Sequence, residues 1–193
     1  MEDLTFKIIF IVLMVIAAIG RAPYAIKSKK IKVMVSKRKG FEIFLLSLSS
    51  LIMITPLVYV FTDWIDSFNF NLPLFVRIIG VLGFAFAVFL HNWSHVALSV
   101  NWSPTLEIKK NQKLITTGPY KYVRHPMYAA FFIWAIFQGI LLSNSLVLAV
   151  GIISIAIVYF SRVDAEEQMM IEQFGKQYRE YMERTGRLWP KIV

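Results

Sequence analysis

Three tyrosines and a histidine lie before or at the start of an apolar run in the segment GPYKYVRHPMYAAFFIWAIF, which covers residues 118–137. Tyr120 and Tyr128 can offer aromatic faces to an adenine ring or to a sulfonium cation. His125 can hold polar groups of a ligand through hydrogen bonds. The Arg-His-Pro triplet at 124–126, taken alone, could also be a basic membrane border with proline in the first turn of a helix. The concentration of these residue types favours a ligand site.

A second group of charged residues, Arg162, Glu166 and Glu167, follows a later apolar run. The guanidinium of Arg162 could bind a carboxylate through two parallel hydrogen bonds, and Glu166 could hold that guanidinium in place. Glu166 could instead act as a general base, which would require a raised pKa beside an apolar site. Because Arg162 and Glu166 stand four residues apart, a surface ion pair worth about 0.3–0.5 kcal/mol is the structural alternative.

His91 and His95 have the spacing of two zinc ligands on one helix face, but no HExxH-like pattern supplies a third ligand. We therefore interpret both as packing residues near the membrane interface and predict no metal site. The chain has no cysteine, which excludes disulfides, thiolate metal sites and a cysteine nucleophile. No G-x-G-x-x-G sequence occurs, so a Rossmann cofactor domain is not indicated.

The elements that carry these residues are predicted to be membrane helices. Hydrophobic residues make up 57% of the 193 residues and charged residues only 17%, which is typical of an integral membrane protein. We expect one all-α, polytopic domain over residues 1–193. Five apolar runs are predicted to be transmembrane helices. They cover residues 4–19, 43–61, 74–90, 127–142 and 145–160.

Short connections predict how the last helices are arranged. Little more than Asn144 separates the final two apolar runs, so these should form an antiparallel helical hairpin. An amphipathic helix is expected to begin at Arg162 and to stop near Gly186. Its apolar and aromatic residues recur at helical spacing from Met170 to Tyr181. This helix could lie against the membrane face and close over the connection between the third and fourth spans.

Basic residues cluster in two connections and predict the orientation of the chain. Lysines and arginines fill residues 21–39 and recur within residues 109–124, whereas residues 63–66 carry two aspartates. Positively charged short loops are held in the cytosol during insertion. The active site and the C-terminus should therefore be cytosolic and the N-terminus outside. The formal net charge of +9 is then explained by topology and by attraction to membrane lipids, without a nucleic-acid partner.

The segments KLITTGPYKYVRHPMY and SRVDAEEQMMIEQFGKQYREYMERT resemble the isoprenylcysteine carboxyl methyltransferase family and its wider relatives, the integral-membrane phospholipid methyltransferases. The resemblance rests on an ordered series: a G-x-Y turn, R-H-P-x-Y at the start of a helical hairpin, then R-x-x-x-E-E and F-G-x-x-Y-x-x-Y. It covers about the last 80 residues, whereas residues 1–100 resemble the family only as three apolar spans. Residues 101–193 would then hold a cofactor loop, the hairpin and a C-terminal catalytic helix.

The resemblance implies an S-adenosylmethionine-dependent methyltransferase that releases S-adenosylhomocysteine, with its cofactor site at the cytosolic membrane face. The catalytic, substrate-side residues of the family would fall on Arg162 and Glu166. Gln112 departs from the family, whose eukaryotic members often carry histidine there, so a side-chain role at Gln112 is left open. The implied cofactor-binding residues are Gln112, Lys113, Leu114, Ile115, Tyr120, His125, Pro126, Tyr128 and Glu167.

The same resemblance favours a lipophilic, isoprenylcysteine-type acceptor whose carboxylate receives the methyl group. Such an acceptor could enter sideways from the bilayer while the cofactor enters from the cytosol. A carboxylate acceptor needs no general base, and Arg162 would align it. The main alternative is a phospholipid amine acceptor, from which Glu166 would remove a proton. A sterol-reductase-like enzyme with a nicotinamide cofactor and a noncatalytic scaffold are two further alternatives.

Overall fold

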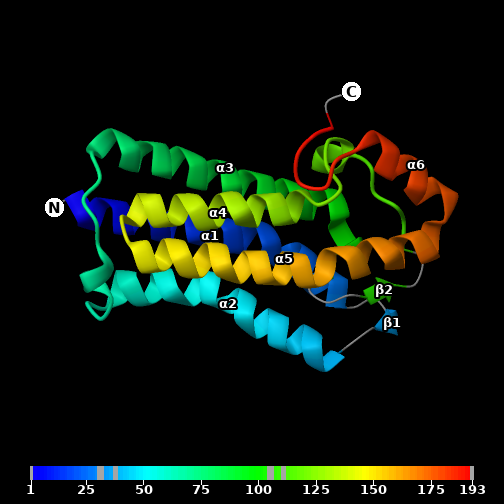
Figure 1. The fold of residues 1–193 in the computed structure, drawn as a ribbon, viewed down its shortest axis with the longest axis horizontal. Helices are drawn as coiled ribbons and strands as arrows, with labels where there is room; N and C mark the ends of the chain where they lie inside the picture. Colours follow the sequence, from blue (N-terminus) through cyan, green and yellow to red (C-terminus); the bar gives the residue numbers. More distant parts are fainter. Residues whose placement is uncertain (1, 30–32, 37–38, 104–106, 110–111, 192–193) are drawn as a thin grey trace.

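The fold is a bundle of five long helices (Figure 1). The structure, a computed structural model, describes residues 2–29, 33–36, 39–103, 107–109 and 112–191. The long helices are α1 (Glu2–Lys29), α2 (Lys39–Phe61), α3 (Leu74–Leu98), α4 (Pro126–Leu142) and α5 (Ser145–Phe174). A shorter helix, α6 (Lys176–Arg184), lies at one end of the bundle, which we call the α6 end. Single 3-10 turns occupy residues 66–68, 99–101 and 118–121.

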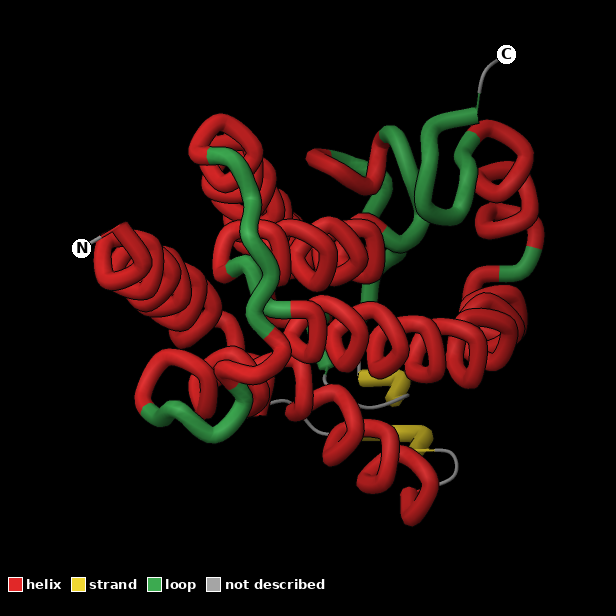
Figure 2. The backbone as a smooth tube through the Cα atoms, turned by 60° about the vertical axis from the view of Figure 1, so that its left-hand side comes forward, coloured by secondary structure: helices red, strands yellow, loops and turns green. Residues whose placement is uncertain are grey.

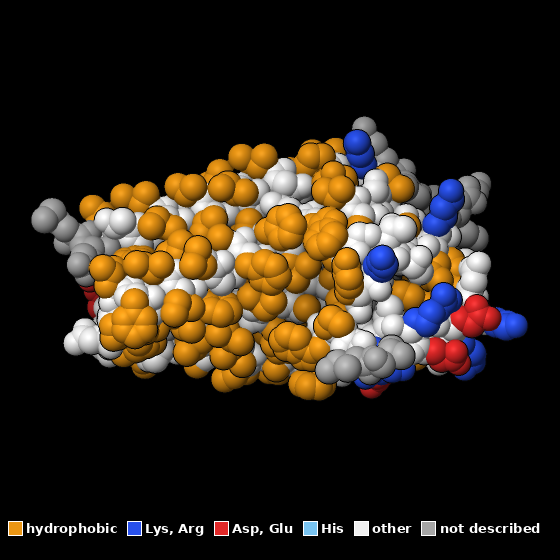
Figure 3. Space-filling model, turned by 90° about the horizontal axis from the view of Figure 1, so that it is seen from above, with side chains coloured by type: hydrophobic (Ala, Val, Ile, Leu, Met, Phe, Trp, Pro, Cys, Tyr) orange, Lys and Arg blue, Asp and Glu red, His pale blue; other side chains and the backbone are white. Residues whose placement is uncertain are grey.

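Helix length and composition make the chain a multi-pass membrane protein, as predicted. Four helices are long and apolar enough to cross a bilayer, with candidate spans at Asp3–Ser28, Gly40–Phe61, Leu74–Asn101 and Ser145–Phe174. The 17 residues of α4 reach only about 25 Å, which is shorter than the ~30 Å hydrocarbon core. Hydrophobic side chains cover most of the surface in view, whereas lysines, arginines and acidic residues gather at the α6 end (Figure 3).

The predicted all-helical, polytopic architecture is confirmed, with one small addition. Two strands, β1 (Val33–Ser36) and β2 (Glu107–Lys109), form an antiparallel pair in which Val33 pairs with Lys109 and Ser36 with Glu107. The pair joins the basic connections that follow α1 and α3. Strands of three and four residues are too short to show the alternation that predicts a strand, so neither was expected.

Three helices extend well beyond their predicted bounds. The predicted first span ends at Ile19, whereas α1 continues to Lys29. The predicted third span ends at Leu90, whereas α3 continues through His95 to Leu98. The amphipathic helix predicted to begin at Arg162 is instead the second half of α5, because no glycine or proline separates it from the preceding apolar run. The break comes at Gly175, whose positive φ of 54° ends α5 before α6 begins.

The predicted hairpin of α4 and α5 is confirmed, and Asn144 fixes it. Ser143 ends α4 in the left-handed conformation, with a φ of 54°. The Asn144 side-chain oxygen accepts a hydrogen bond from the backbone N–H of Val147 (3.0 Å) and so caps α5. Its amide nitrogen donates to the Ile65 carbonyl (2.9 Å) and to Oδ1 of Asn69 (2.8 Å). The hairpin is thereby tied to the connection between α2 and α3.

We expect Asn144→Ala to lower the free energy of unfolding by about 1.5–4 kcal/mol, because it removes three hydrogen bonds at a fully buried position. Ser145→Ala is the matched control: it removes one exposed hydrogen bond, to the Phe68 carbonyl, and should cost about 1 kcal/mol or less. Denaturant unfolding of the purified variants in one detergent measures both changes. Equal unfolding midpoints for the two variants would contradict the role assigned to Asn144.

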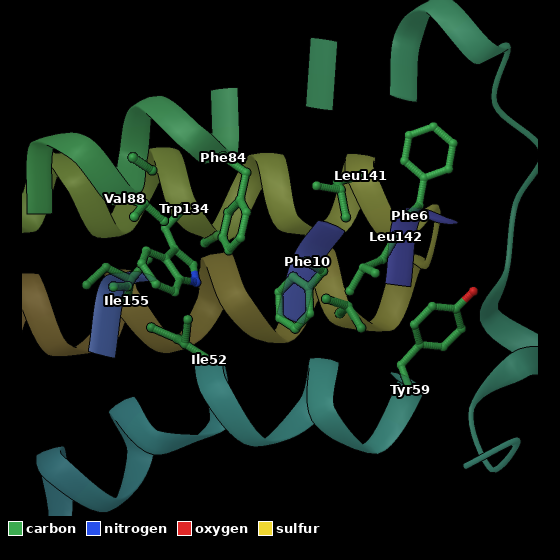
Figure 4. Packing of buried hydrophobic residues seen from close by; sticks show 14 residues of the cluster. Phe6, Phe10, Ile52, Tyr59, Phe84, Val88, Trp134, Leu141, Leu142 and Ile155 are labelled. Carbon is green, nitrogen blue, oxygen red and sulfur yellow. The ribbon is translucent and has the colours of Figure 1, made fainter. Parts of the chain in front are cut away.

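Aromatic rings of α1, α3 and α4 pack against one another in the apolar core, to which α2 and α5 also contribute side chains such as Ile52 and Ile155 (Figure 4). The Phe84 ring meets the Trp134 ring edge-on, with 4.8 Å between centroids, and stacks on the Phe10 ring at 5.3 Å. The Trp134 indole N–H donates to Oε1 of Gln138 (3.0 Å), which satisfies the indole nitrogen inside the apolar interior. These three helices therefore form a firmly packed unit.

The end of the bundle opposite α6 is held by close backbone packing and a buried arginine. A Cβ added at Gly80 of α3 would lie 2.7 Å from the backbone nitrogen of Leu141, so α3 and α4 approach closely there. Arg77 of α3 donates to the Leu141 carbonyl (3.3 Å) and pairs with Asp3 of α1 (2.5 Å). Its guanidinium also lies 3.9 Å from the centroid of the Phe6 ring. These contacts tie α1, α3 and α4 together.

The α6 end brings the predicted site segments together. The connection before α4, the second half of α5, α6 and the β1–β2 pair all lie there, whereas α1 begins at the opposite end (Figure 1, Figure 2). At this end α2 also diverges from α5 (Figure 1). The basic connections predicted to share one side of the membrane thus share one end of the molecule. Which side faces the cytosol stays a prediction.

Candidate active site

A cavity of about 500 Å³ lies at the α6 end, between α2, α3, α4, α5, α6 and the segment 112–120. Most of the predicted site residues line it: Gln112, Lys113, Leu114, Ile115, Tyr120, His125, Tyr128, Arg162 and Glu166. The other two, Pro126 and Glu167, do not line it. Pro126 is the first residue of α4. Residues predicted from separate motifs therefore meet around one space.

Gly118 turns the chain into the wall of this cavity. Thr117 is extended, and Gly118, with a positive φ of 61°, begins the 3-10 turn that carries Tyr120. A side chain at Gly118 would be strained, and its Cβ would lie 3.3 Å from the indole nitrogen of Trp93 on α3. The glycine of the G-x-Y motif is therefore needed for conformation and for space, and it places Tyr120 at a buried position.

The phenol of Tyr181 attaches α6 to this turn. Its O–H donates to the Tyr120 carbonyl at 2.6 Å. Burial raises the pKa of Tyr181 to about 12, so the phenol keeps the proton that this hydrogen bond needs at neutral pH. Burial also raises the pKa of Tyr120 well above the ordinary tyrosine value. Both phenols line the cavity in their neutral form, next to Tyr178.

Arg124 attaches the segment after α6 to the start of α4. Its Nε donates to Oε1 of Glu167 (2.8 Å), and its Nη1 donates to the carbonyls of Met182 (3.2 Å) and Thr185. Its backbone N–H donates to the Gly186 carbonyl (2.8 Å), which makes a short parallel pairing between the two segments. The Arg-His-Pro triplet is therefore an attachment point inside the fold as well as a helix start.

Glu167 is the centre of a buried charge cluster. Its Oε1 accepts hydrogen bonds from Nε of Arg124 (2.8 Å) and Nε2 of His125 (3.2 Å). Its Oε2 accepts from Nε (3.1 Å) and Nη2 (2.7 Å) of Arg187, which also pairs with Asp164 (2.7 Å). The hydrogen bonds to Glu167 raise the pKa of Arg187 above its ordinary value. Four donors thus occupy the acceptor capacity of one carboxylate.

This cluster changes the role expected for Glu167. Because its carboxylate is buried, lies outside the cavity lining and already accepts four hydrogen bonds, the geometry favours an indirect role and not contact with the ammonium of a cofactor. Arg187 is absent from the predicted site, since it follows the family-like motifs and belongs to no motif itself. The only sequence signal is a basic residue directly after Gly186, where the predicted helix stops.

Arg162 is buried inside the bundle, so the interpretation as a surface ion pair is wrong. Its Nη2 lies 3.4 Å from Oε2 of Glu42, a buried acid in the first turn of α2. Glu166, one helical turn further on, accepts a hydrogen bond from the Tyr128 O–H (3.2 Å). α2 therefore contributes an acid to the site. Sequence reasoning missed Glu42 because it directly precedes the predicted second span, where a charge is typical of a membrane border.

His91 and His95 lie one turn apart on α3, with 4.4 Å between ring centroids. Nδ1 of His95 donates to the His91 carbonyl (3.0 Å), and the His91 ring makes edge-on contacts with Phe131 and Trp134. These contacts agree with the predicted packing role, and both histidines also line the cavity. Among the residues that the structure describes, no three His, Asp or Glu side chains are grouped so that they could hold a metal ion.

Two residues that line the cavity are also exposed, in different parts of the molecule. Lys113 lines it and is exposed at the α6 end, where the charged side chains gather (Figure 3). Ile54 of α2 also lines it and is 49% exposed on the side of the bundle. One exposed lining residue is thus charged and the other is apolar.

The central part of the chain matches a known family model. Residues 78–172 match the model of the isoprenylcysteine carboxyl methyltransferase family. This segment belongs to that family. It contains all eleven predicted site residues, from Gln112 to Glu167, whereas Glu42, Arg187 and all of α6 lie outside it. Most residues that line the cavity therefore lie within the family-matched segment, whereas those from α1, α2 and α6 lie outside it.

Two curated relatives of this family agree with the match. The protein-S-isoprenylcysteine O-methyltransferase of Saccharomyces cerevisiae is 34% identical over 96 residues, which cover 50% of this chain and 37% of the relative. The enzyme of the same name from Schizosaccharomyces pombe is 31% identical over 122 residues, which cover 62% of this chain and 52% of the relative. The chain thus spans between about a third and a half of the length of these relatives.

A solved structure supports the fold. The structure of the eukaryotic intramembrane Ras methyltransferase, an isoprenylcysteine carboxyl methyltransferase, superposes with a TM-score of 0.55 over 82% of this chain and 55% of that chain. The sequence identity is 23%, so this likeness concerns the fold alone. The predicted membrane architecture of the family is therefore present in this chain.

Proposed function

We propose that this chain is an S-adenosylmethionine-dependent methyltransferase that acts at the membrane–cytosol interface and methylates the carboxylate of a lipophilic, isoprenylcysteine-type acceptor. The observation that supports this most strongly is the single cavity around which the family-matched residues meet. The names of the two curated relatives supply the reaction class. The cavity supplies a space in which a cofactor and an acceptor can be held together.

The residues present fit S-adenosylmethionine. A volume of about 500 Å³ lies within the range of roughly 300–1,000 Å³ that is usual for small-molecule sites. Tyr120 and Tyr128 offer aromatic surface for adenine or the sulfonium. The backbone of residues 112–115 can offer hydrogen-bonding groups whatever the Gln112 side chain does. When bound, the cofactor supplies an activated methyl group on a good leaving group.

Glu167 determines which nitrogen of His125 is left for a ligand. Because a carboxylate only accepts hydrogen bonds, His125 carries a proton on Nε2, which donates to Glu167. In the neutral ring, Nδ1 keeps its lone pair and can accept a hydrogen bond from a hydroxyl or ammonium group of the cofactor. Glu167 therefore supports cofactor binding through His125.

Arg162 is the group that we assign to the acceptor carboxylate. Its guanidinium lines the cavity and is held by Glu42 at 3.4 Å, so its position is set before an acceptor binds. A carboxylate acceptor is already the nucleophile, and the protein needs only to align it and to exclude water. The buried surroundings of Arg162 favour both. The relatives are isoprenylcysteine O-methyltransferases by name, and the name of the matched family specifies a carboxyl group, which favours this acceptor over a phospholipid amine.

The charged Lys113 and the apolar Ile54, both exposed and both lining the cavity, suit two substrates of different solubility. An acceptor with a long apolar chain would enter near Ile54, from the side that faces lipid. The cofactor would enter near Lys113, at the α6 end, which we propose faces the cytosol. The polar residues at the start of α4 would then lie where the two routes meet.

We expect the purified protein in detergent to bind S-adenosylmethionine and S-adenosylhomocysteine, measured by titration calorimetry. His125→Ala should weaken this binding roughly tenfold or more, since one charge-assisted contact amounts to ~1.5–3 kcal/mol. A nicotinamide dinucleotide, the cofactor of the sterol-reductase alternative, should give no heat. If a folded sample bound neither sulfur compound, the proposed function would be overturned.

A further inference from the structure

The segment after α6 returns to the Arg-His-Pro triplet and attaches there through Arg187. The backbone N–H of His125 donates to the Arg187 carbonyl at 2.9 Å. The Arg187 guanidinium holds Oε2 of Glu167 from two nitrogens, at 2.7 and 3.1 Å, and reaches Asp164 as well. One residue thus contacts both the backbone of His125 and the acid that fixes the His125 ring.

The two carboxylate oxygens of Glu167 accept hydrogen bonds from different residues. Oε1 faces Arg124 and His125, and Oε2 faces Arg187 alone among the described residues. A carboxylate is planar, so holding Oε2 also sets the direction in which Oε1 points. If Arg187 is removed, Oε2 loses both donors and the carboxylate can turn toward Arg124, away from His125.

We propose that Arg187 is a positioning residue for His125: through Glu167 it keeps the proton of the ring on Nε2 and leaves Nδ1 as an acceptor for the cofactor. This inference rests on the proposed function for its ligand, but the contacts that carry it are independent of any ligand. It extends the cofactor site beyond the family-matched segment 78–172. The residue acts from outside the cavity and contacts neither cofactor nor acceptor.

The burial of the three partners makes this proposal testable without a large packing defect. The Arg187 side chain is 41% exposed, whereas those of Glu167 and His125 are 4% and 5% exposed. Truncation of Arg187 therefore removes charge and hydrogen bonds but leaves no apolar cavity. Lysine at this position keeps the charge but cannot donate to Oε2 from two nitrogens and to Asp164 in the same fixed geometry, so it should rescue only in part.

The first test measures binding of S-adenosylhomocysteine to the parent, Arg187→Ala, Arg187→Lys and Lys191→Ala. Lys191 is the matched control, because it lies in the same terminal segment and its ammonium donates to the Glu183 carbonyl (2.8 Å) and not, among the described residues, to Glu167 or His125. We expect the alanine variant at Arg187 to raise the Kd roughly tenfold, the lysine variant to recover part of this loss, and the control to stay within about twofold. The KM for the cofactor should rise while kcat at saturation changes little. Parent-like affinity of Arg187→Ala, or an equal loss in the control, would overturn the proposal.

The second test measures which nitrogen of the His125 ring carries the proton, and it needs no ligand. The chain has three histidines, so ¹⁵N-histidine NMR in detergent can be assigned with His125→Ala. We expect the Nε2–H form in the parent and in Lys191→Ala, and a mixture of the two neutral forms in Arg187→Ala. An unchanged His125 signal in Arg187→Ala would refute the positioning role. A changed signal together with no cofactor binding by the parent would support the role and overturn only the proposed function.

Discussion

Arg162→Ala is expected to abolish most methyl transfer to an isoprenylcysteine-type acceptor, with a fall of roughly 100- to 1,000-fold in kcat/KM. Loss of one buried, preorganised donor to the reacting group corresponds to ~2.7–4 kcal/mol of transition-state stabilisation. The affinity for S-adenosylhomocysteine should stay within about twofold, because Arg162 is assigned to the acceptor. Initial rates at saturating cofactor, with calorimetry on the same samples, measure both quantities.

The partner of Arg162 requires a control. Alanine at this position leaves the buried carboxylate of Glu42 without the guanidinium at 3.4 Å, and such a change can cost ~3–5 kcal/mol of stability. The double variant Arg162→Ala/Glu42→Gln removes both charges and should recover the unfolding midpoint without recovering turnover. If the double variant methylated the acceptor at the parent rate, Arg162 would have no part in the reaction. Activity on a phospholipid amine alone would make Glu166 the residue to test.

Gly80→Leu is expected to have the largest effect on folding, with a loss of at least ~3 kcal/mol or no recoverable folded protein. A Cβ at Gly80 would lie 2.7 and 2.9 Å from backbone atoms of Leu141, and a backbone cannot move aside as a side chain can. The contrast is Gly83, where the nearest atoms belong to the Phe137 side chain, which can move by a change of rotamer without a shift of the backbone. Separation of α3 from α4 would also displace His125, since it directly precedes α4.

The control for this prediction is Gly40→Leu. Gly40 also lies in a membrane helix, α2, but a Cβ there meets no atom within 4 Å. The two variants add the same side chain, so a difference between them reports packing and not hydrophobicity. Gel-filtration recovery and unfolding midpoints in one detergent provide the measurement. Similar recovery of both variants would show that α3 and α4 do not need the close approach at Gly80.

Much of the fold could be predicted because membrane helices leave a plain signal. Apolar runs of sufficient length identify spans, and a turn as short as the one at Asn144 forces an antiparallel hairpin. The bounds were less certain for a physical reason. Polar residues such as His95 and Arg162 lie inside helices that continue past the apolar run, because polar side chains facing a cavity need not end a helix.

The candidate site could be predicted where it depends on short motifs and not where it depends on distant pairing. Tyr120, His125 and Tyr128 lie in one ordered motif, and the fold places all three on the cavity. Glu42 and Arg187 reach the site from elements before and after the matched segment, and no local spacing links them to it. Their roles depend on the tertiary arrangement of α2 and of the segment after α6, which sequence periodicity does not report.

The position of the cavity along the bundle limits which lipids the proposed enzyme can use. The opposite end is closed by the contacts of Arg77 and Gly80, whereas Arg162 and His125, the residues assigned to the two substrates, lie in the half of the bundle that holds α6. An acceptor anchored in the leaflet at that end can reach Arg162 by lateral diffusion. An acceptor anchored in the other leaflet has to cross the bilayer first. Methylation by this chain would therefore be selective for lipid-modified substrates that are anchored in the leaflet at the α6 end.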